Sequence, residues 1–261
     1  MRPRGRKSLK LLIVADPWNA DAKFLAKRFA HLESKRPDLI AVFGGDGTML
    51  RAIRRYWRRK IPFVGVNLGH RGFLMSTVAD VTPEFFAGPF IHRTVPLLEI
   101  EVTKPNGAKR RTFAFNDAHV RVKLPHAGWF EIEVDGEVRI PKLVADGVLV
   151  STAAGSTAYA TAMGANPVPI GTEVLVVVGS NVAEPQGWKH GANLPLGSEV
   201  VFRTKDSSSW RKIYGVADST GLGEITEMRI RSSKTAKVEL LLTPDHDLAR
   251  KLALLQFPNQ G

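Results

Sequence analysis

Cysteine is absent from this sequence of 261 residues, which excludes disulfide bonds and thiolate metal sites. Long hydrophobic runs are absent as well, and stretches such as residues 174–178 are far too short to span a bilayer. The basic residues 1–8 are followed by a strand-like segment and not by an apolar signal region. The seven histidines show no metal-binding spacing. These absences predict a cytoplasmic protein whose own side chains form no metal site.

Several signatures of nucleotide-using enzymes are also missing. The sequence has no Gly-x-x-x-x-Gly-Lys-Ser/Thr, which argues against a P-loop NTPase. Gly65, Gly69 and Gly72 do not have the spacing of the dinucleotide fingerprint. The His-Arg-Asp and Asp-Phe-Gly motifs of protein kinases and the Gly-x-Ser-x-Gly elbow of hydrolases do not occur. Any phosphate chemistry must therefore use a different loop.

The charge balance is strongly basic, with 37 Lys and Arg against 25 Asp and Glu and a formal net charge of +12 at pH 7. Such a surplus favours polyanionic partners, which include nucleic acid, an anionic membrane surface and phosphorylated small molecules. It is equally compatible with solubility alone. Hydrophobic residues make up 44% of the chain, which is typical of a globular protein with a sizeable core, arranged as one large domain or two small ones.

One stretch stands out in what is present. The apolar run 39–43 predicts a strand, and it ends in Gly44-Gly45-Asp46-Gly47-Thr48 directly before a helix-like segment. Bare backbone amides at a helix N-terminus are suited to phosphate binding. Asp46 conflicts with that use, because a carboxylate repels phosphate unless a metal or a reacting hydroxyl lies beside it. The loop therefore indicates chemistry, although an ordinary turn stabilised by the Asp side chain is the alternative.

The first part of the chain alternates strands and helices. Residues 9–16, 39–43 and 61–67 are predicted strands, and helical spacing covers residues 21–32 and 49–57. A second glycine-rich loop, residues 68–74, follows the third strand, and ligands of open α/β sheets bind at such strand ends. Arginines recur on one face of the second helix, and such a stripe usually faces solvent. Arg51, on the first turn, is the candidate for a ligand contact.

After residue 90 the pattern changes to short alternating segments separated by turn signals, which predicts an all-β region. A small helix-compatible insert, residues 155–163, interrupts it. Residues 227–231 and 237–242 are predicted as separate strands, and residues 181–196 and 206–209 as loops. A last helix is expected at residues 248–255 after an Asp245 cap.

The order of four polar clusters resembles the NAD kinase family. These clusters are Gly44-Gly-Asp-Gly-Thr48, Gly65-Val-Asn-Leu-Gly-His-Arg-Gly-Phe-Leu74, Asn116-Asp117, and Asp146-Gly-Val-Leu-Val-Ser-Thr-Ala-Ala-Gly-Ser-Thr-Ala-Tyr159. The first motif alone is shared with diacylglycerol, sphingoid and phosphofructokinase-type kinases, whereas the second and fourth are much more specific.

The resemblance implies an α/β N-terminal domain, doubly wound and phosphofructokinase-like, and an all-β sandwich-like C-terminal domain, with a C-terminal tail that returns to the first domain. We assign residues 1–92 plus 243–261 to the first domain and residues 93–242 to a β-rich NAD-binding domain. The implied reaction transfers the γ-phosphoryl of ATP, or of polyphosphate, to the 2′-hydroxyl of the adenosine ribose of NAD. Mg²⁺ or another divalent cation would accompany the nucleotide, and a homodimer or homotetramer is expected, with no nucleic acid or membrane partner.

The implied roles fall on the matching positions. Asp46 is the catalytic candidate, because a ribose hydroxyl needs a group that orients it or accepts its proton. The residues expected to bind the phosphate donor are Gly44, Gly45, Thr48, Arg51 and Arg71. The residues expected to bind NAD are Asp46, Gly47, Phe73, Asn116, Asp117, Asp146, Thr157, Ala158, Tyr159 and Ala162.

The chain departs from the family pattern at several positions. Asp117 stands where Glu is frequent, Ala153-Ala154 replace a Pro-Thr pair, Ala162 replaces a serine, and no Pro-His-Ser-Leu segment is present. The chain is thus a divergent member, and the choices between ATP and polyphosphate and between NAD and NADH stay open. Two alternatives also stay open: a diacylglycerol- or sphingoid-type lipid kinase with the same glycine loop, and a basic nucleic-acid-binding protein without catalysis.

Overall fold

The computed structural model describes residues 9–123, 126–205, 212–246 and 248–257. It divides into two compact units: unit 1 comprises Met1–Thr94 and Lys237–Lys251, and unit 2 comprises Val95–Ala236 and Leu252–Gly261. Two strands, β4 (Ile91–Thr103) and β15 (Glu227–Leu242), run from one unit into the other. The boundary therefore lies inside continuous strands, where no turn signal marks it in the sequence. This division differs at its edges from the predicted domains 1–92 plus 243–261 and 93–242, which stay a prediction.

Unit 1 is a parallel α/β layer. Strands β1 (Leu11–Ala15), β2 (Leu39–Gly44) and β3 (Phe63–Asn67) pair in that order, and the end of β15 adds a fourth parallel strand through Leu240 and Leu241. The helical elements of this unit are α1 (Ala20–Phe29), η1 (Ala30–Leu32), α2 (Asp46–Tyr56), η2 (Trp57–Arg59) and η3 (Pro83–Ala87).

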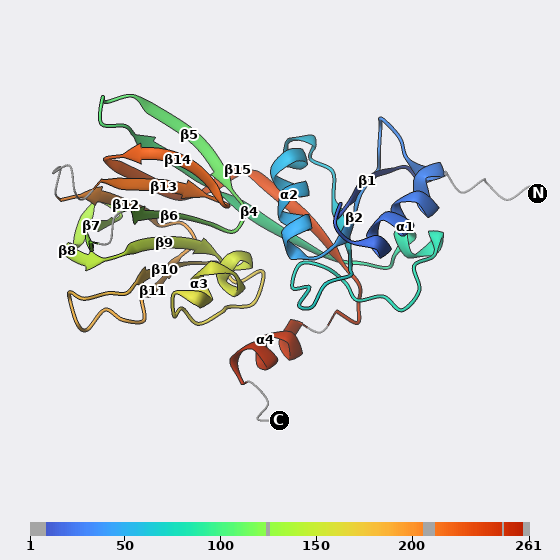
Figure 1. Cartoon of the computed structure of the whole chain (residues 1–261). Coiled ribbons are helices and arrows are strands. Elements are labelled where there is room, and N and C mark those ends of the chain that lie inside the picture. Colours follow the sequence, from blue (N-terminus) through green and yellow to red (C-terminus); the bar gives the residue numbers. More distant parts are fainter. Residues whose placement is uncertain (1–8, 124–125, 206–211, 247, 258–261) are drawn as a thin grey trace, which may run out of the picture. The chain divides into compact units, whose positions relative to one another are not determined.

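Strand β2 is buried along its whole length, which explains its unbroken apolar sequence. Ala41 and Phe43 pack with the α1 residues Leu25 and Phe29 in one core cluster. Since side chains alternate along a strand, Ile40 points to the opposite face, and α2 also packs against β2. Helices on both faces make unit 1 the doubly wound layer that the sequence predicts (Figure 1).

Unit 2 is a β-sandwich. One sheet has the order β11-β10-β9-β6-β13-β14, which Figure 1 shows within this unit, and the other contains the unit 2 parts of β4 and β15 together with β5, β7, β8 and β12. The new strands are β5 (Lys109–Ala114), β6 (Asp117–Val122), β7 (Gly128–Val134), β8 (Glu137–Ala145), β9 (Gly147–Thr152), β10 (Val174–Ser180), β11 (Ala192–Pro195), β12 (Glu199–Thr204), β13 (Ile213–Ala217) and β14 (Thr220–Ile225).

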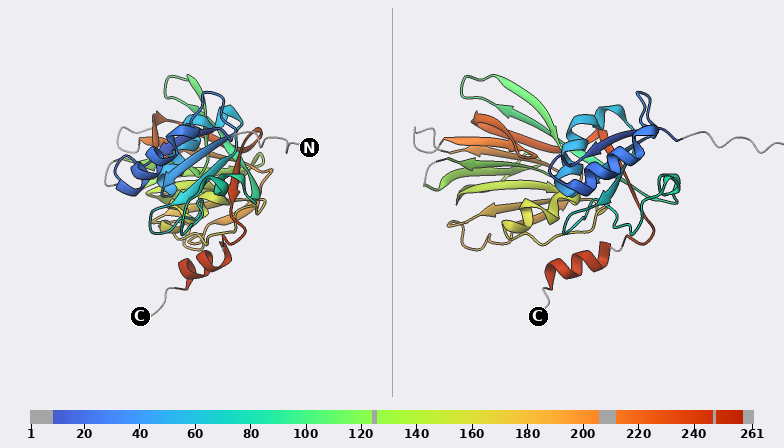
Figure 2. Two further views of the ribbon diagram at one scale, coloured as in Figure 1. Left: turned by 90° about the vertical axis from the view of Figure 1, so that its right-hand side faces the viewer. Right: turned by 45° about the vertical axis from the view of Figure 1, so that its right-hand side comes forward.

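Buried residues of both sheets, including Leu98, Phe130, Val150 and Phe202, form one core cluster between the layers. The view at the right of Figure 2 shows the strands of this unit running alongside one another. The fold class predicted from the sequence, an α/β domain plus a β-sandwich with a returning tail, is confirmed. The tail returns through the end of β15 and is followed by helix α4 (Leu248–Gln256).

Some local predictions were wrong. The segments 227–231 and 237–242 are parts of the single strand β15, and residues 181–196, predicted as a loop, contain β11. No strand was predicted at Thr220–Ile225, where β14 lies. The insert 155–163, predicted only to be compatible with a helix, contains a short η4 (Ala154–Thr157) followed by α3 (Tyr159–Ala162). The predicted loop at 206–209 lies outside the described residues, in which no helix is long and apolar enough to cross a membrane.

Candidate active site

The glycine loop joins β2 to the N-terminus of α2. The helix begins at Asp46, three residues before the predicted start at 49, and Gly45 is its cap, without a side-chain hydrogen bond. The positive end of the helix dipole therefore lies at this loop, which favours a bound anion. Gly44 has a φ of +151°, and a Cβ at this position would lie 2.7 Å from the Thr48 hydroxyl oxygen. The turn therefore requires glycine at position 44.

The second glycine-rich loop lies against the first. The amide of Leu68 donates to the carbonyl of Gly44 at 2.7 Å. A Cβ at Gly69 would lie 3.4 Å from the Cα of Gly45, so the two backbones approach closely. Because β2 and β3 are parallel neighbours, both loops leave the sheet at the same edge. The structure thus brings the first two predicted clusters together.

Asp46 holds a fixed position between these loops. Its two carboxylate oxygens accept hydrogen bonds from the amides of Phe73, at 2.9 Å, and Leu74, at 2.8 Å. Each carboxylate oxygen has a second lone pair, so Asp46 retains acceptor capacity for a further donor. Phe73 is 6% exposed, so its ring is largely packed inside the unit.

A lysine of the C-terminal helix also reaches this loop. The ammonium of Lys251 donates to the carbonyl of Gly72 at 2.6 Å. Burial lowers the pKa of Lys251, and the negative charges of Asp46 and Asp245 oppose that shift. Nothing local in the sequence indicates this contact, because the two partners are 179 positions apart.

A carboxylate that the sequence analysis overlooked engages two predicted donor-binding residues. Asp16, directly after β1, accepts hydrogen bonds from the hydroxyl of Thr48, at 2.8 Å, and from the guanidinium of Arg51, at 3.3 Å. Hydrogen bonds from the Trp18 amide and from Thr48, together with the charge of Arg51, hold the pKa of Asp16 below its usual value. The rule that ligands gather at the carboxyl ends of parallel strands would have found Asp16, because β1 ends there. Arg71 is exposed on the second loop.

In unit 2, Asn116 and Asp117 form a corner that is held in place by a residue about 100 positions later in the chain. The buried carboxylate of Asp218 accepts hydrogen bonds from the amides of Phe115, Asn116 and Asp117, at 2.6, 2.8 and 3.3 Å. Asp218 lies in the turn between β13 and β14 with a φ of +44°, a conformation that Asp tolerates better than most residues. The side-chain oxygen of Asn116 is buried and has no hydrogen-bond partner among the described residues. The side-chain oxygen of Asn116 can therefore accept a hydrogen bond.

The turn after β9 packs against the same corner. The amide of Thr152 donates to the carbonyl of Asn116 at 2.9 Å, and the Thr152 hydroxyl accepts from the amide of Gly155 at 3.1 Å. A Cβ at Gly155 would lie 2.2 Å from the Asn116 carbonyl oxygen, so only glycine fits. The fourth predicted cluster therefore meets the third, and Thr157 and Ala158 follow in the same turn.

Tyr159 and Ala162 are both exposed on α3. The Tyr159 ring lies 5.1 Å from the ring of His119, centroid to centroid, and Nδ1 of His119 is 3.3 Å from the Asp117 carboxylate. His119 links the aromatic surface to the predicted acidic residue, and the sequence analysis missed it. Its signal was the two-residue spacing from Asp117, which places both side chains on one face of β6.

Asp146 is separate from this group. Strands β6 and β9 are antiparallel, with Asp117 opposite Ser151 and Arg121 opposite Gly147. Asp146, just before Gly147, is therefore about 16 Å along the pair from the Asn116 corner. Its carboxylate accepts a hydrogen bond from the side-chain amide of Asn181 at 2.6 Å. One copy of the chain does not bring Asp146 to the other predicted NAD-binding residues of unit 2.

The pKa of Asp218 leads to a testable pH dependence. Burial raises its pKa to about 6, well above the usual value for Asp, against the lowering effect of the three amide donors. Between these values the unfolded chain releases the proton first, so the folded state loses about 3 kcal/mol of stability as the pH rises from 4 to 7. Asp218→Asn does not titrate and should lack this component. Urea unfolding of both proteins across that pH range measures the difference between their free energies of unfolding. If the pKa of Asp218 is not raised, this difference should not change with pH.

The geometry defines a class of protein: an α/β unit with a glycine loop at a helix N-terminus, followed in the chain by a β-sandwich that carries an exposed tyrosine beside His119. Two solved structures share this fold. Yeast NADH kinase, described in complex with NADH, superposes with a TM-score of 0.81 at 18% identity, over 98% of this chain and 89% of its own. An NAD kinase from Archaeoglobus fulgidus, described in complex with ATP, gives a TM-score of 0.74 at 19% identity, over 94% and 98%.

Sequence comparisons give the family. Residues 6–87 match the family model of the ATP-NAD kinase N-terminal domain. The NAD kinase of Xanthomonas oryzae pv. oryzae is 31% identical over 247 residues, which covers 93% of this chain and 94% of the relative. That of Rickettsia rickettsii is 33% identical over 250 residues, which covers 92% and 96%. The chain belongs to the NAD kinase family and is a kinase that acts on NAD. This assignment takes the place of the lipid-kinase and nucleic-acid-binding alternatives.

Proposed function

We propose that the enzyme transfers the γ-phosphoryl group of ATP to the 2′-hydroxyl of the adenosine ribose of NAD, and that Asp46 acts on this hydroxyl. The observation that carries the proposal is the fixed Asp46 carboxylate at the N-terminus of α2. The ribose oxygen bonds to the γ-phosphorus as the bond from that phosphorus to the bridging oxygen of ADP breaks. The hydroxyl proton passes to a free lone pair of Asp46.

The donor is bound by the glycine loop. The amides of Gly44, Gly45 and Gly47 and the dipole of α2 would neutralise phosphate charge. Thr48 and Arg51 already contact Asp16, so Asp16 would hold Arg51 in place for the same phosphates. Arg71 would add a further cation from the second loop. ATP is the proposed donor, and the complex of the Archaeoglobus fulgidus neighbour with ATP supports it.

NAD is bound by unit 2. The unused side-chain oxygen of Asn116 and the carboxylate of Asp117 would accept hydrogen bonds from its hydroxyl or amino groups. Tyr159 would stack on the adenine, with Thr157, Ala158 and Ala162 around it. The NADH complex of the yeast neighbour supports a nicotinamide dinucleotide in this fold. Gly47 and Phe73 lie in unit 1, and their predicted contact with NAD stays a prediction.

Mg²⁺ is proposed to arrive with the nucleotide. Among the described residues there is no group of three His, Asp or Glu side chains that could hold a metal ion, and the oxygens of Asp46 already accept two amides. These residues do not fit a resident metal site. Mg²⁺ characteristically binds substrate phosphates with few protein ligands, so it would come as part of the donor complex.

The position of Asp146 favours a homo-oligomer. Asp146 lies at the far end of the β6–β9 pair from the Asn116 corner, so it would bind NAD only at the site of a second copy. A homodimer or homotetramer in the cytoplasm is the proposed state.

The experiment incubates the purified protein with Mg²⁺, NAD and either ATP or polyphosphate, and measures NADP with an NADP-specific dehydrogenase. Formation of NADP with ATP supports the proposal, and formation with polyphosphate alone would reassign the donor. A parallel incubation with NADH, read as NADPH, gives the acceptor preference. Phosphate on another hydroxyl, found by NMR of the product, would overturn the proposed regiochemistry.

Tyr159 allows a test of the adenine-binding surface. It is 45% exposed, so its removal has little effect on stability. Since stacking on an aromatic ring contributes about 1–3 kcal/mol per base, Tyr159→Ala should raise KM for NAD by about 5- to 160-fold. Tyr159→Phe keeps the ring and should keep KM near the wild-type value. Equal KM values for all three proteins would exclude stacking on this residue.

A further inference from the structure

A basic pocket lies in unit 1 at the opposite end of the sheet from the glycine loop. It is a cavity of about 630 Å³ lined by Lys10, Lys35, Arg36, Pro37, Asp38, Arg59 and Ile61. These residues lie at or just before the amino ends of β1, β2 and β3, or at the end of η2. The glycine loop lies at the carboxyl end of β2, about 17 Å away along the strand. The pocket is therefore distinct from the proposed donor site.

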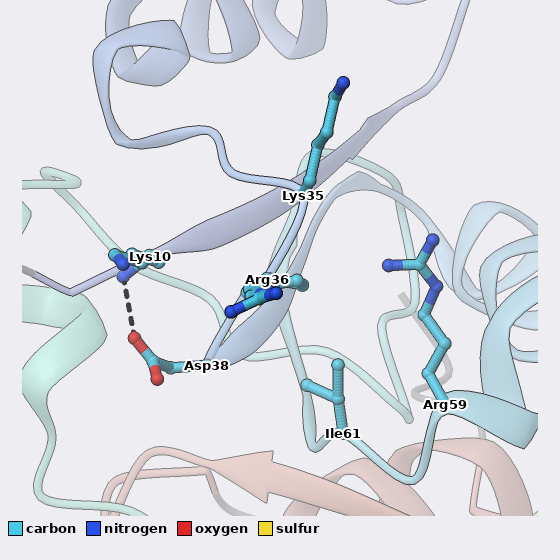
Figure 3. A pocket seen from close by; sticks show the side chains of 7 residues that line it. Lys10, Lys35, Arg36, Asp38, Arg59 and Ile61 are labelled. Atoms are coloured by element: carbon cyan, nitrogen blue, oxygen red, sulfur yellow. Dashed lines mark hydrogen bonds between the residues drawn. The ribbon is translucent and has the colours of Figure 1, made fainter.

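Among the described residues, four cations and one carboxylate line this pocket. Figure 3 shows Lys35 and Arg36 coming from the turn before β2, and Arg59 from the end of η2. The carboxylate of Asp38 accepts a hydrogen bond from the backbone amide of Lys10 at 3.0 Å, so it holds the two strand starts together. Two backbone hydrogen bonds, from the amides of Asp38 and Leu39 to the carbonyl of Lys10, reinforce the same junction.

The four cationic groups form no ion pair with the acidic side chains that the structure describes. In residues 9–123, 126–205, 212–246 and 248–257, no ion pair joins Lys10, Lys35, Arg36 or Arg59 to a carboxylate. Residues 1–8, which precede Lys10, contain no Asp or Glu at all. Like charges gathered around one cavity repel one another, and an anion in the cavity relieves that repulsion.

The arginines near the end of the helical stripe contact aromatic rings. Arg55 lies 5.2 Å from the ring centroid of Tyr56, and Arg58 lies 4.4 Å from that of Trp57. The guanidinium of Arg59 is 5.6 Å from the centroid of Tyr56 and also lines the pocket. The aromatic contact restricts the side chain, so less conformational entropy is lost when it binds a ligand.

We propose that this pocket binds a linear chain of linked phosphates, as found in a nucleoside triphosphate or in inorganic oligophosphate. Its volume falls within the range of small-molecule sites. Cations from three separate segments suit a ligand with several charges along its length, and guanidinium groups suit phosphate oxygens. None of the described residues that line the pocket is an aromatic on which a base could stack, so the phosphates are the recognised part.

Site-resolved lysine labelling tests this proposal. The full-length protein is acetylated with and without inorganic tripolyphosphate, and labelling of each lysine is measured by mass spectrometry. Lys10 and Lys35 should be protected several-fold, whereas Lys23 and Lys27, exposed on α1, serve as internal controls and should not change. Equal labelling of all four lysines would overturn the proposal. Since the glycine loop contains no lysine, a phosphate bound there does not produce the expected result.

Calorimetry of matched variants gives an independent measure. Lys35→Ala/Arg36→Ala/Arg59→Ala should weaken tripolyphosphate binding by about tenfold or more, and added salt should weaken the wild-type affinity because the cations are exposed. Lys23→Ala/Lys27→Ala/Arg93→Ala removes the same number of exposed charges elsewhere in unit 1 and should bind like wild type. Equal affinities for the two triple variants would refute a specific pocket.

Two further ligands identify what the pocket recognises. ATP and tripolyphosphate should protect Lys10 and Lys35 alike, and adenosine should not. Protection by ATP without protection by tripolyphosphate would show that the nucleoside is read and would overturn the proposal. Duplex DNA that protects these lysines while tripolyphosphate does not would also overturn it. The pocket variant should keep its NAD kinase turnover, so the outcome is independent of the proposed roles of Asp46 and Tyr159.

Discussion

Asp46→Asn should reduce turnover of NAD by about 10²- to 10⁴-fold, which is the usual contribution of a positioned general base. The variant keeps the size and shape of the side chain but loses the group that accepts the hydroxyl proton. It also places an amide group against the N–H of Phe73 or Leu74, so one of the two hydrogen bonds to the second loop is lost. The fold should persist, because a lost hydrogen bond to a charged group costs about 1.5–3 kcal/mol, which is only a fraction of the stability of a typical folded protein.

The split between kcat and KM separates the chemical role of Asp46 from its structural one. If Asp46 accepts the proton, Asp46→Asn should lower kcat and leave KM for both substrates near wild type. If Asp46 only holds the second loop, KM should change together with kcat. Steady-state kinetics and a thermal melt of each protein provide the measurements. Asp21→Asn, which changes an exposed acid in the first turn of α1, is the control and should be fully active. Near-normal turnover of Asp46→Asn would exclude the base.

The parts of the fold that could be predicted are those in which a local pattern and burial agree. Strand β2 is buried on both faces, so its sequence is an unbroken apolar run that ends in glycine. Strands β11 and β14 were missed because neither shows such a pattern: β11 is half-exposed and ends in Pro195, and β14 contains Gly221 and Gly223. They are strands because neighbouring strands supply backbone hydrogen-bond partners, which the segments alone do not encode.

The candidate site likewise contains residues that could be predicted from the sequence and residues that could not. The two glycine loops and the Asn116 corner were predicted, because glycine and polar residues after an apolar strand are visible in the chain itself. Asp218 was not, since it reaches the amides of residues 115–117 across about 100 positions and appears in sequence as an ordinary turn residue. Lys251 was missed for the same reason. Residues at the strand ends of a site can be identified from the sequence. Residues that hold the site in place from a distant element can be identified only once the fold is known.

Gly155→Ala is the second substitution with a large expected effect. The added Cβ would lie 2.2 Å from the carbonyl oxygen of Asn116 and 2.6 Å from its carbonyl carbon and Cα. All three are backbone atoms, so the clash cannot be relieved by a side-chain rotation. The same carbonyl accepts hydrogen bonds from the amide of Thr152 and the hydroxyl of Ser151. Either the turn at η4 or the Asn116 corner must move, at a cost of about 1–3 kcal/mol.

That movement should appear in NAD binding and not in donor binding. Asn116 and the turn that leads to Tyr159 are the two parts that separate, so KM for NAD should rise by about tenfold or more while KM for ATP stays near wild type. Gly197→Ala serves as the matched control, because a Cβ there meets no atom within 4 Å and the residue lies in the same unit. Initial rates with each substrate varied in turn give both constants, and urea unfolding gives the stability loss. A stable Gly155→Ala protein with an unchanged KM for NAD would show that the corner formed by residues 115–117 and the η4 turn does not bind this substrate.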